Sequence, residues 1–253
     1  MKRASLLGSG LAVVMSLALA GSAMAAAFTN GGFNNTGGYS VGAFVRLYAG
    51  TGTATAIPGW TVTSGNVDWI GSYWQSADAD GYSLDMDGDA PGAITQTFDT
   101  TVNATYFVQF SLSGNPDPNT LCDNNPQVPD PNACYSPSDK SLQVQATGAP
   151  ATTVYFNTGT EGNTESNMMW EVEGYSFVAT GPSTTLTFTS TTPGAFGPAL
   201  DNVTVTQEAT ATGAQCKDGG WQSMVNPDTL VAFKNQGACV SYYAVSGQVP
   251  IGN

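Results

Sequence analysis

The segment Val67–Gln75, VDWIGSYWQ, places two tryptophans and a tyrosine within nine residues, and a polar segment follows it directly. Flat aromatic rings can stack on the apolar C–H face of a sugar ring, while short carboxylates and amides hydrogen-bond its hydroxyl groups. We therefore predict a ligand-binding site that consists of Asp68, Trp69, Tyr73, Trp74, Gln75 and Asn115. Trp74 is the first candidate for stacking because it stands nearest the polar segment.

A structural interpretation of the same residues stays open, because aromatic clusters in β-domains often belong to the core. In that interpretation Trp69 lies in a strand, and Tyr73 and Trp74 close one end of the domain. Trp60 follows Pro58 and Gly59 and is predicted to be a core residue.

The sequence contains no histidine, which excludes the Ser-His-Asp and Cys-His nucleophile systems and imidazole general bases. Glu171 and Glu173 flank Val172 on a predicted strand, where their Cα atoms would lie ~7 Å apart, within reach of a carboxylate glycosidase pair. In a chain with 19 acidic residues, however, neighbouring acids on a solvent-facing strand are expected without catalysis. We predict that the protein is not an enzyme.

Charge and hydropathy indicate the compartment. Lys2 and Arg3 precede an apolar run that closes with GSAMA, which predicts a secretory signal peptide over residues 1–25. No later segment has the ~20 continuous apolar residues of a membrane span, so none is expected after cleavage. The formal net charge of −13 repels nucleic acid and anionic membranes, so we expect neither as a partner.

The four cysteines are even in number and are predicted to be exported, so they are expected to form disulfides. Three pairings are possible, and local spacing favours Cys122 with Cys134 and Cys216 with Cys239.

Nine short segments rich in Val, Thr, Phe and Tyr recur between turn signals, and they predict strands. In Thr105–Ser113, for example, Tyr106, Val108, Phe110 and Leu112 would point one way, as in a half-buried strand. The polar residues Gln109, Ser111 and Ser113 would point the other way. The nine predicted strands are Ile57–Thr63, Tyr82–Met86, Ala93–Phe98, Thr105–Ser113, Ser141–Thr147, Thr152–Phe156, Tyr175–Ala179, Thr184–Ser190 and Asp201–Thr206. With no alternation of strands and helices, they indicate an all-β, two-sheet sandwich, with a jelly roll as the first choice.

The composition divides the chain into three parts after the signal peptide. Residues 26–206 are the predicted sandwich, residues 207–215 a small-residue linker, and residues 216–253 a small C-terminal module. Because a module of this length buries little apolar surface, we expect its disulfide to hold it together.

Six ordered motifs carry a family resemblance: NGGF, IPGW, VDWIGSYWQ, SLDMDG with PGAITQTF, SLSGNP, and GPALDNVTV. Across about residues 28–206 the chain resembles the choice-of-anchor C family of secreted proteins, and the related plant cell-wall family of unknown function. The resemblance implies a galactose-binding-like jelly roll and association with carbohydrate or cell-wall polymers. It implies no reaction.

The resemblance also implies a possible structural calcium ion between the first and last strands, at positions that correspond to Asn34 and Asp201. The family pattern usually has Glu where this chain has Asn34, which removes one negative ligand. A second acidic segment, DMDGD at Asp85–Asp89, lacks the later glutamate of an EF-hand loop and is interpreted as a strand that ends in a turn.

The leading functional hypothesis is a secreted, non-catalytic protein that binds polysaccharide or cell-wall glycan. The alternative is a structural protein of an extracellular matrix or surface that acts through protein–protein contacts. A carboxylate glycosidase is the third class.

Overall fold

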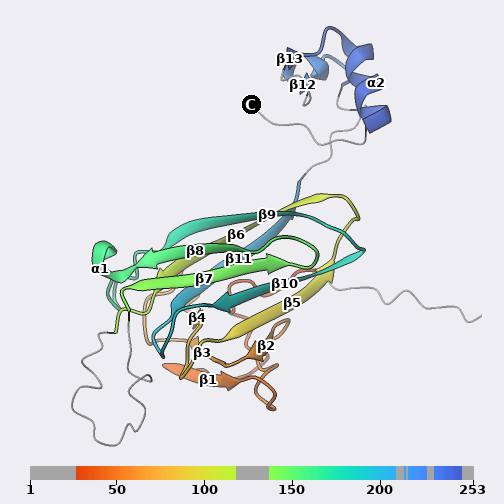
Figure 1. Cartoon of the computed structure of the whole chain (residues 1–253). Helices are drawn as coiled ribbons and strands as arrows, with labels where there is room; N and C mark the ends of the chain where they lie inside the picture. Colours follow the sequence, from red (N-terminus) through yellow and green to blue (C-terminus); the bar gives the residue numbers. More distant parts are fainter. Residues whose placement is uncertain (1–26, 118–136, 209–213, 215, 227–230, 247–253) are drawn as a thin grey trace, which may run out of the picture.

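The computed structural model describes residues 27–117, 137–208, 214, 216–226 and 231–246. Two antiparallel sheets form the body of the protein (Figure 1). The larger sheet contains, in spatial order, β1 (Phe44–Tyr48), β3 (Asn66–Ile70), β4 (Ser83–Asp85), β11 (Pro198–Gln207), β6 (Thr105–Gly114) and β9 (Glu171–Val178). The smaller sheet contains β2 (Thr61–Ser64), β5 (Ala93–Asp99), β10 (Ser183–Ser190), β7 (Asp139–Ala146) and β8 (Thr152–Asn157).

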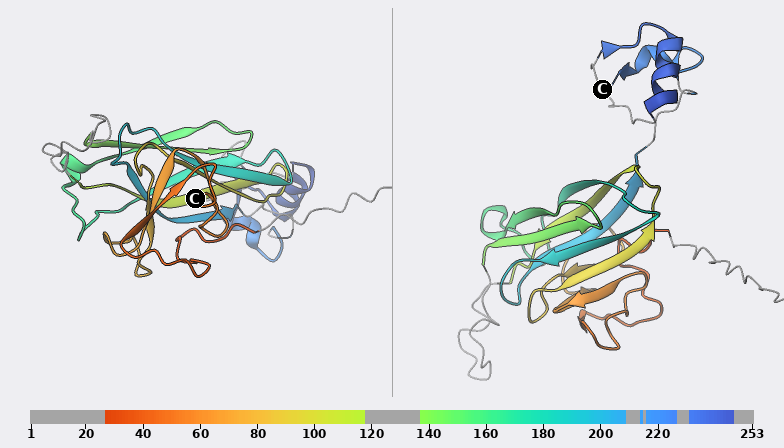
Figure 2. Two further views of the ribbon diagram at one scale, coloured as in Figure 1. Left: turned by 90° about the horizontal axis from the view of Figure 1, so that it is seen from below. Right: turned by 45° about the vertical axis from the view of Figure 1, so that its right-hand side comes forward.

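The order of the strands is that of a jelly roll. From β4 to β7, and again from β8 to β11, each connection carries the chain from one sheet to the other. The two layers are also visible in the views of Figure 2. Such wrapping joins both sheets around one core, and it confirms the predicted all-β jelly-roll sandwich.

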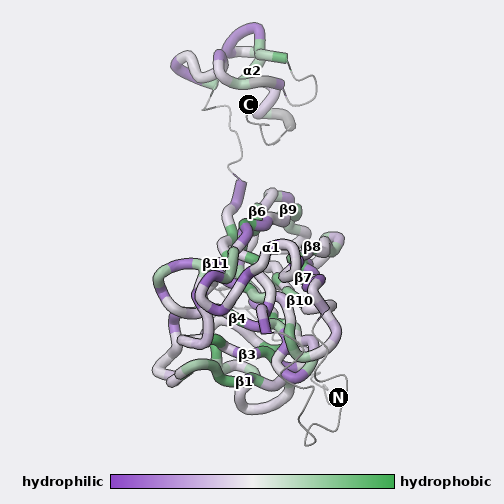
Figure 3. Tube along the Cα trace, turned by 90° about the vertical axis from the view of Figure 1, so that its left-hand side faces the viewer, coloured by the Kyte–Doolittle hydropathy of each residue, from purple (hydrophilic) through white to green (hydrophobic). Residues whose placement is uncertain are grey.

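The core lies between the sheets, and along each strand every second side chain points into it. On β6, Val108, Phe110 and Leu112 point inward as predicted, and on β10 Leu186 and Phe188 meet them from the other sheet. The predicted core residue Trp60 is 2% exposed, which confirms that prediction. Figure 3 shows hydrophobic stretches along β1 and β3 as well.

The structure differs from the expected pattern at the end of β6. Ser111 and Ser113 alternate with the core residues yet are buried, because the segment that precedes β9 covers this end of the outer face. The hydroxyl group of Ser113 donates a hydrogen bond to the carbonyl oxygen of Met168 in that segment. A short helix that the sequence did not predict, α1 (Thr158–Glu161), follows β8.

The C-terminal unit contains a 3-10 helix, η2 (Gly220–Ser223), the strands β12 (Val225–Asn226) and β13 (Val231–Ala232), and the helix α2 (Gln236–Ser246). The predicted disulfide between Cys216 and Cys239 is present, with Cα atoms 5.7 Å apart, and Phe233 and Tyr243 pack around it. The predicted pair Cys122 and Cys134 and the predicted signal peptide lie outside the described residues. Among the helices that are described, none is long and apolar enough to cross a membrane.

Candidate functional site

A row of charged side chains crosses the outer face of the larger sheet. Arg46 on β1 stands opposite Asp68 on β3, and Asp68 stands opposite Asp85 on β4. Directly opposed residues of antiparallel strands point to the same face, so the pairing brings the three side chains together. Val67 and Trp69 alternate with Asp68 along β3 and point to the core instead.

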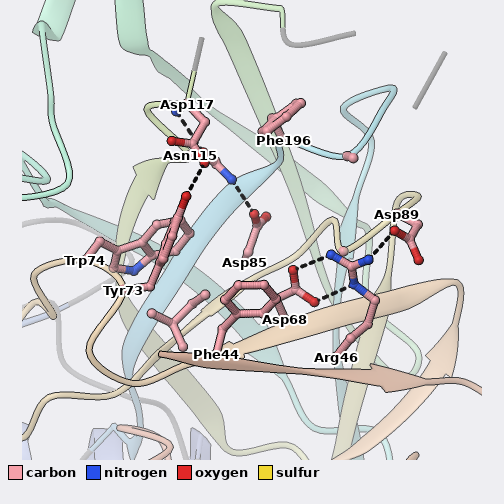
Figure 4. Close-up of a pocket in the computed structure, with 13 residues that line it drawn as sticks. Phe44, Arg46, Asp68, Tyr73, Trp74, Asp85, Asp89, Asn115, Asp117 and Phe196 are labelled. Carbon is pink, nitrogen blue, oxygen red and sulfur yellow. Dashed lines mark hydrogen bonds and ion pairs between the residues drawn. The ribbon is translucent and has the colours of Figure 1, made fainter. Parts of the chain in front are cut away.

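These charged residues line a pocket with a volume of about 250 Å³ (Figure 4). Aromatic side chains form part of its wall. Phe44, which is 44% exposed, makes an edge contact with the ring of Tyr73 at a centroid distance of 5.6 Å. Phe196, from the loop before β11, lies on the other side of the pocket.

The guanidinium of Arg46 is held by two carboxylates. Its Nε and Nη2 donate hydrogen bonds to the two oxygens of Asp68 at 2.7 and 2.8 Å, and its Nη1 forms an ion pair with Asp89. The hydrogen bond with Asp68 contributes most to raising the pKa of Arg46 above its ordinary value. Such a bidentate pair fixes the plane of both groups.

Asp85 and Asn115 form the deepest polar pair of the pocket. The amide nitrogen of Asn115 donates to Asp85 Oδ2 at 2.7 Å, and the backbone N–H groups of Asp87 and Gly197 donate to Oδ1. Burial, followed by the charge of Asp87, raises the pKa of Asp85 well above its ordinary value.

Tyr73 and Asp117 form a third polar pair at the rim. The Tyr73 hydroxyl donates to Asp117 Oδ2 at 2.8 Å, and the backbone N–H of Asp117 donates to Asn115 Oδ1. Burial and the hydrogen bond to Asp117 both raise the pKa of Tyr73. The hydroxyl is therefore a neutral donor at physiological pH.

Asp87 and Lys140 are two further buried charged residues next to Asp85. Lys140 is fully buried and donates from Nζ to the carbonyl oxygen of Phe196 at 2.7 Å, while burial lowers its pKa to about 8. Burial raises the pKa of Asp87 to about 7, although Ser190 and Lys140 lie close enough to oppose the shift. Among the described residues neither oxygen of Asp87 has a hydrogen-bond partner of acceptable geometry.

Four of the six residues predicted from the sequence to bind ligand line this pocket: Asp68, Tyr73, Trp74 and Asn115. Trp74 is 5% exposed, so it supports the wall and offers little of its ring face to a ligand. Gln75 lines a neighbouring hollow, and its Oε1 accepts a hydrogen bond from the backbone N–H of Met168.

The placement of Trp69 corrects its predicted role. Its ring is fully buried in the core, and its indole Nε1 donates to the carbonyl oxygen of Phe33 at 3.1 Å. Asp68 and Trp69 are neighbours on one strand, so they point to opposite faces and do not line the same pocket.

Sequence reasoning missed nine of the lining residues, among them Phe44, Arg46, Asp85, Asp89, Asp117 and Phe196. The signal for the first two was available, because FVRLY at Phe44–Tyr48 has the alternation of a strand. The sequence interpretation of Asp85–Asp89, a strand that ends in a turn, predicts no ligand-binding role for Asp85 or Asp89. Nothing in the sequence places Phe196 near β1.

The predicted calcium positions lie elsewhere on the sandwich. The amide nitrogen of Asn34 donates to Asp80 Oδ2 at 2.6 Å, and the two oxygens of Asp201 accept the backbone N–H groups of Ala77 and Asn202. In this arrangement the amide nitrogen of Asn34, and not its oxygen, faces the carboxylate of Asp80. The calcium ion stays a prediction. The described residues contain no group of three or more acidic, His or Cys side chains that could hold a metal ion.

Glu171 and Glu173, the pair considered for a glycosidase, are half-buried on β9, opposite Leu112 and Phe110 of β6. Neither lines the pocket.

A comparison with protein families matches residues 26–206 to the family described as "Protein of unknown function (DUF642)". The chain belongs to this family. The matched range coincides with the predicted sandwich domain. Membership agrees with the resemblance to a cell-wall family of unknown function, while the choice-of-anchor C resemblance stays a prediction.

The chain is also similar to individual proteins. Halomucin of Haloquadratum walsbyi is 30% identical over 163 residues, which are 62% of this chain, and the match spans about 1% of halomucin. Among solved structures, TmCBM61 in complex with β-1,4-galactotriose has a TM-score of 0.38 and 13% identity, over 71% of this chain and 96% of that chain. A CBM35 from Paenibacillus barcinonensis has a TM-score of 0.37 and 16% identity, over 65% of this chain and 98% of that chain.

Proposed function

We propose that this DUF642 protein is a secreted, non-catalytic carbohydrate-binding protein, and that the pocket over β1, β3 and β4 binds a unit of a polysaccharide or cell-wall glycan. One observation carries the proposal: the exposed ring of Phe44 and the ring of Tyr73 lie beside the carboxylate of Asp68 and the amide of Asn115 in one pocket. A sugar needs both an apolar surface for its C–H face and fixed polar groups for its hydroxyls.

The geometry supports binding rather than acid–base catalysis. Asp68 is held by Arg46, and Asp85 already accepts three hydrogen bonds from Asn115, Asp87 and Gly197. Carboxylates fixed in this way provide oriented acceptors at little entropic cost when a ligand binds. A volume of about 250 Å³ suits one small unit or a chain end.

The test is a Phe44→Ala substitution, followed by binding of the full chain to a glycan array and by thermal unfolding. Phe44 is 44% exposed, so its loss should cost about 1–3 kcal/mol of glycan binding free energy with little change in melting temperature. The matched control is Phe107→Ala, because Phe107 is 45% exposed on β6 and does not line the pocket. Equal binding by both variants would contradict the proposed site.

A second candidate, a structural role through protein–protein contacts, has a specific observation in its favour. Phe107, Val172 and Val178 are exposed on the outer faces of β6 and β9, and β9 is an edge strand of the larger sheet. Exposed apolar side chains beside an open sheet edge can support association. Concentration-dependent self-association that Val172→Lys abolishes, without any glycan binding, would favour this candidate.

A further inference from the structure

The pocket is strongly biased toward negative charge. Four carboxylates line it, those of Asp68, Asp85, Asp89 and Asp117, against the single guanidinium of Arg46. Burial raises the pKa of Asp85, and the three other carboxylates alone outnumber the single guanidinium.

The one cation in the lining is already neutralised. Arg46 has Asp68 and Asp89 as ion-pair partners, and its side chain is only 27% exposed. An incoming anion would have to displace one of these carboxylates, and it would approach the other carboxylates at short range. Bringing two like charges into contact costs far more binding free energy than an exposed ion pair contributes.

The hydrogen-bonding groups of the pocket are biased as well, toward acceptors. The amide nitrogen of Asn115 and the hydroxyl of Tyr73 donate to Asp85 and Asp117 within the pocket. Carboxylate oxygens can accept more than one hydrogen bond, so acceptor capacity remains on the pocket side. A ligand rich in donors, such as hydroxyl or ammonium groups, matches this surface.

We infer that the pocket selects uncharged sugars and amino sugars, and rejects sugars that carry carboxylate or sulfate groups. The inference rests on the proposed function, and it names the class of sugar for the same site. The formal net charge of −13 of the whole chain acts in the same direction at long range.

The test uses the full chain and an array of oligosaccharides in matched pairs: hexuronic-acid oligomers with their methyl esters, and N-acetylated amino-sugar oligomers with their free amines. We expect each methyl ester to bind at least roughly tenfold more tightly than its acid at low salt, and the difference to shrink as salt screens the charges. Free amines should bind at least as well as their N-acetylated partners.

Asp89→Asn removes one carboxylate from the pocket rim, where Asp89 is exposed, and should reduce the preference for esters severalfold. The control is Asp99→Asn, which makes the same change in net charge at an exposed residue outside the pocket. Acids that bind as tightly as their esters would overturn the inference and leave the proposed function intact. Failure of every uncharged sugar to bind, or binding that Phe44→Ala leaves unchanged, would overturn the proposed function itself.

Discussion

The indole Nε1 of Trp74 donates a hydrogen bond to the hydroxyl oxygen of Ser83 at 2.8 Å, in a buried position at the start of β4. The ring of Trp74 packs against Ile70, Met168 and Ala199 in a small cluster on the outer side of the larger sheet. Trp74 therefore supports the pocket wall from behind, and Phe44 provides the exposed ring.

Replacement of Trp74 by Ala should lower the free energy of unfolding by about 3–5 kcal/mol, because it leaves a cavity and removes the partner of Ser83. Chemical denaturation, with Trp60→Ala as a core control, checks the prediction. A Trp74→Ala protein that is as stable as wild type but no longer binds glycan would instead establish Trp74 as the stacking residue.

The free energy of unfolding should fall as the pH rises from about 4 to about 7, because burial raises the pKa of Asp87 from 3.8 to about 7. In this window the folded protein retains a proton that the unfolded chain has released, so raising the pH favours unfolding. The contribution amounts to at most about 4 kcal/mol. Asp85, whose pKa is also raised, acts in the same direction. Urea denaturation at several pH values measures the slope.

Asp87→Asn provides the control for this pH dependence. The amide has nearly the shape of the carboxyl group but does not titrate, so the slope between pH 4 and pH 7 should become smaller. An unchanged slope would show that Asp87 is not the group responsible.

The calcium prediction requires the side-chain amide of Asn34 to turn, so that its oxygen rather than its nitrogen faces Asp80. An ion that binds only the folded state would then raise the melting temperature by mass action. Asn34→Glu should enlarge that increase, because it restores a negative ligand. The measurement is a calcium titration of chelator-stripped protein, and an unchanged melting temperature in both proteins would remove calcium from this fold.

Peptide mapping without reduction should link Cys216 to Cys239, and should also link Cys122 to Cys134 as the sequence predicts. Each of these bonds closes a short loop, which stabilises the folded state by about 3 kcal/mol on chain-entropy reasoning. Cys239→Ser should therefore expose the C-terminal unit to proteolysis and leave the sandwich resistant. A peptide that joins Cys122 or Cys134 to the C-terminal cysteines would contradict the division into two units.

Much of the fold could be predicted from the sequence because its signals are local. The alternation of Val108, Phe110 and Leu112 on β6 reflects burial of one strand face, and that pattern needs no knowledge of distant partners. The same holds for the jelly-roll class, for Trp60 as a core residue, and for the disulfide between Cys216 and Cys239, whose short separation favours pairing.

The composition of the pocket was decided by the tertiary structure. Arg46, Asp68 and Asp85 lie on three different strands, and only the register of β1, β3 and β4 makes them neighbours. Burial of Trp74 depends likewise on Met168, which is far away in sequence. From the sequence, we predict that an aromatic and acidic segment binds ligand, and part of that segment lines the pocket. Strand pairing, which joins residues without regard to their separation along the chain, determined which of those side chains face the pocket and which face the core.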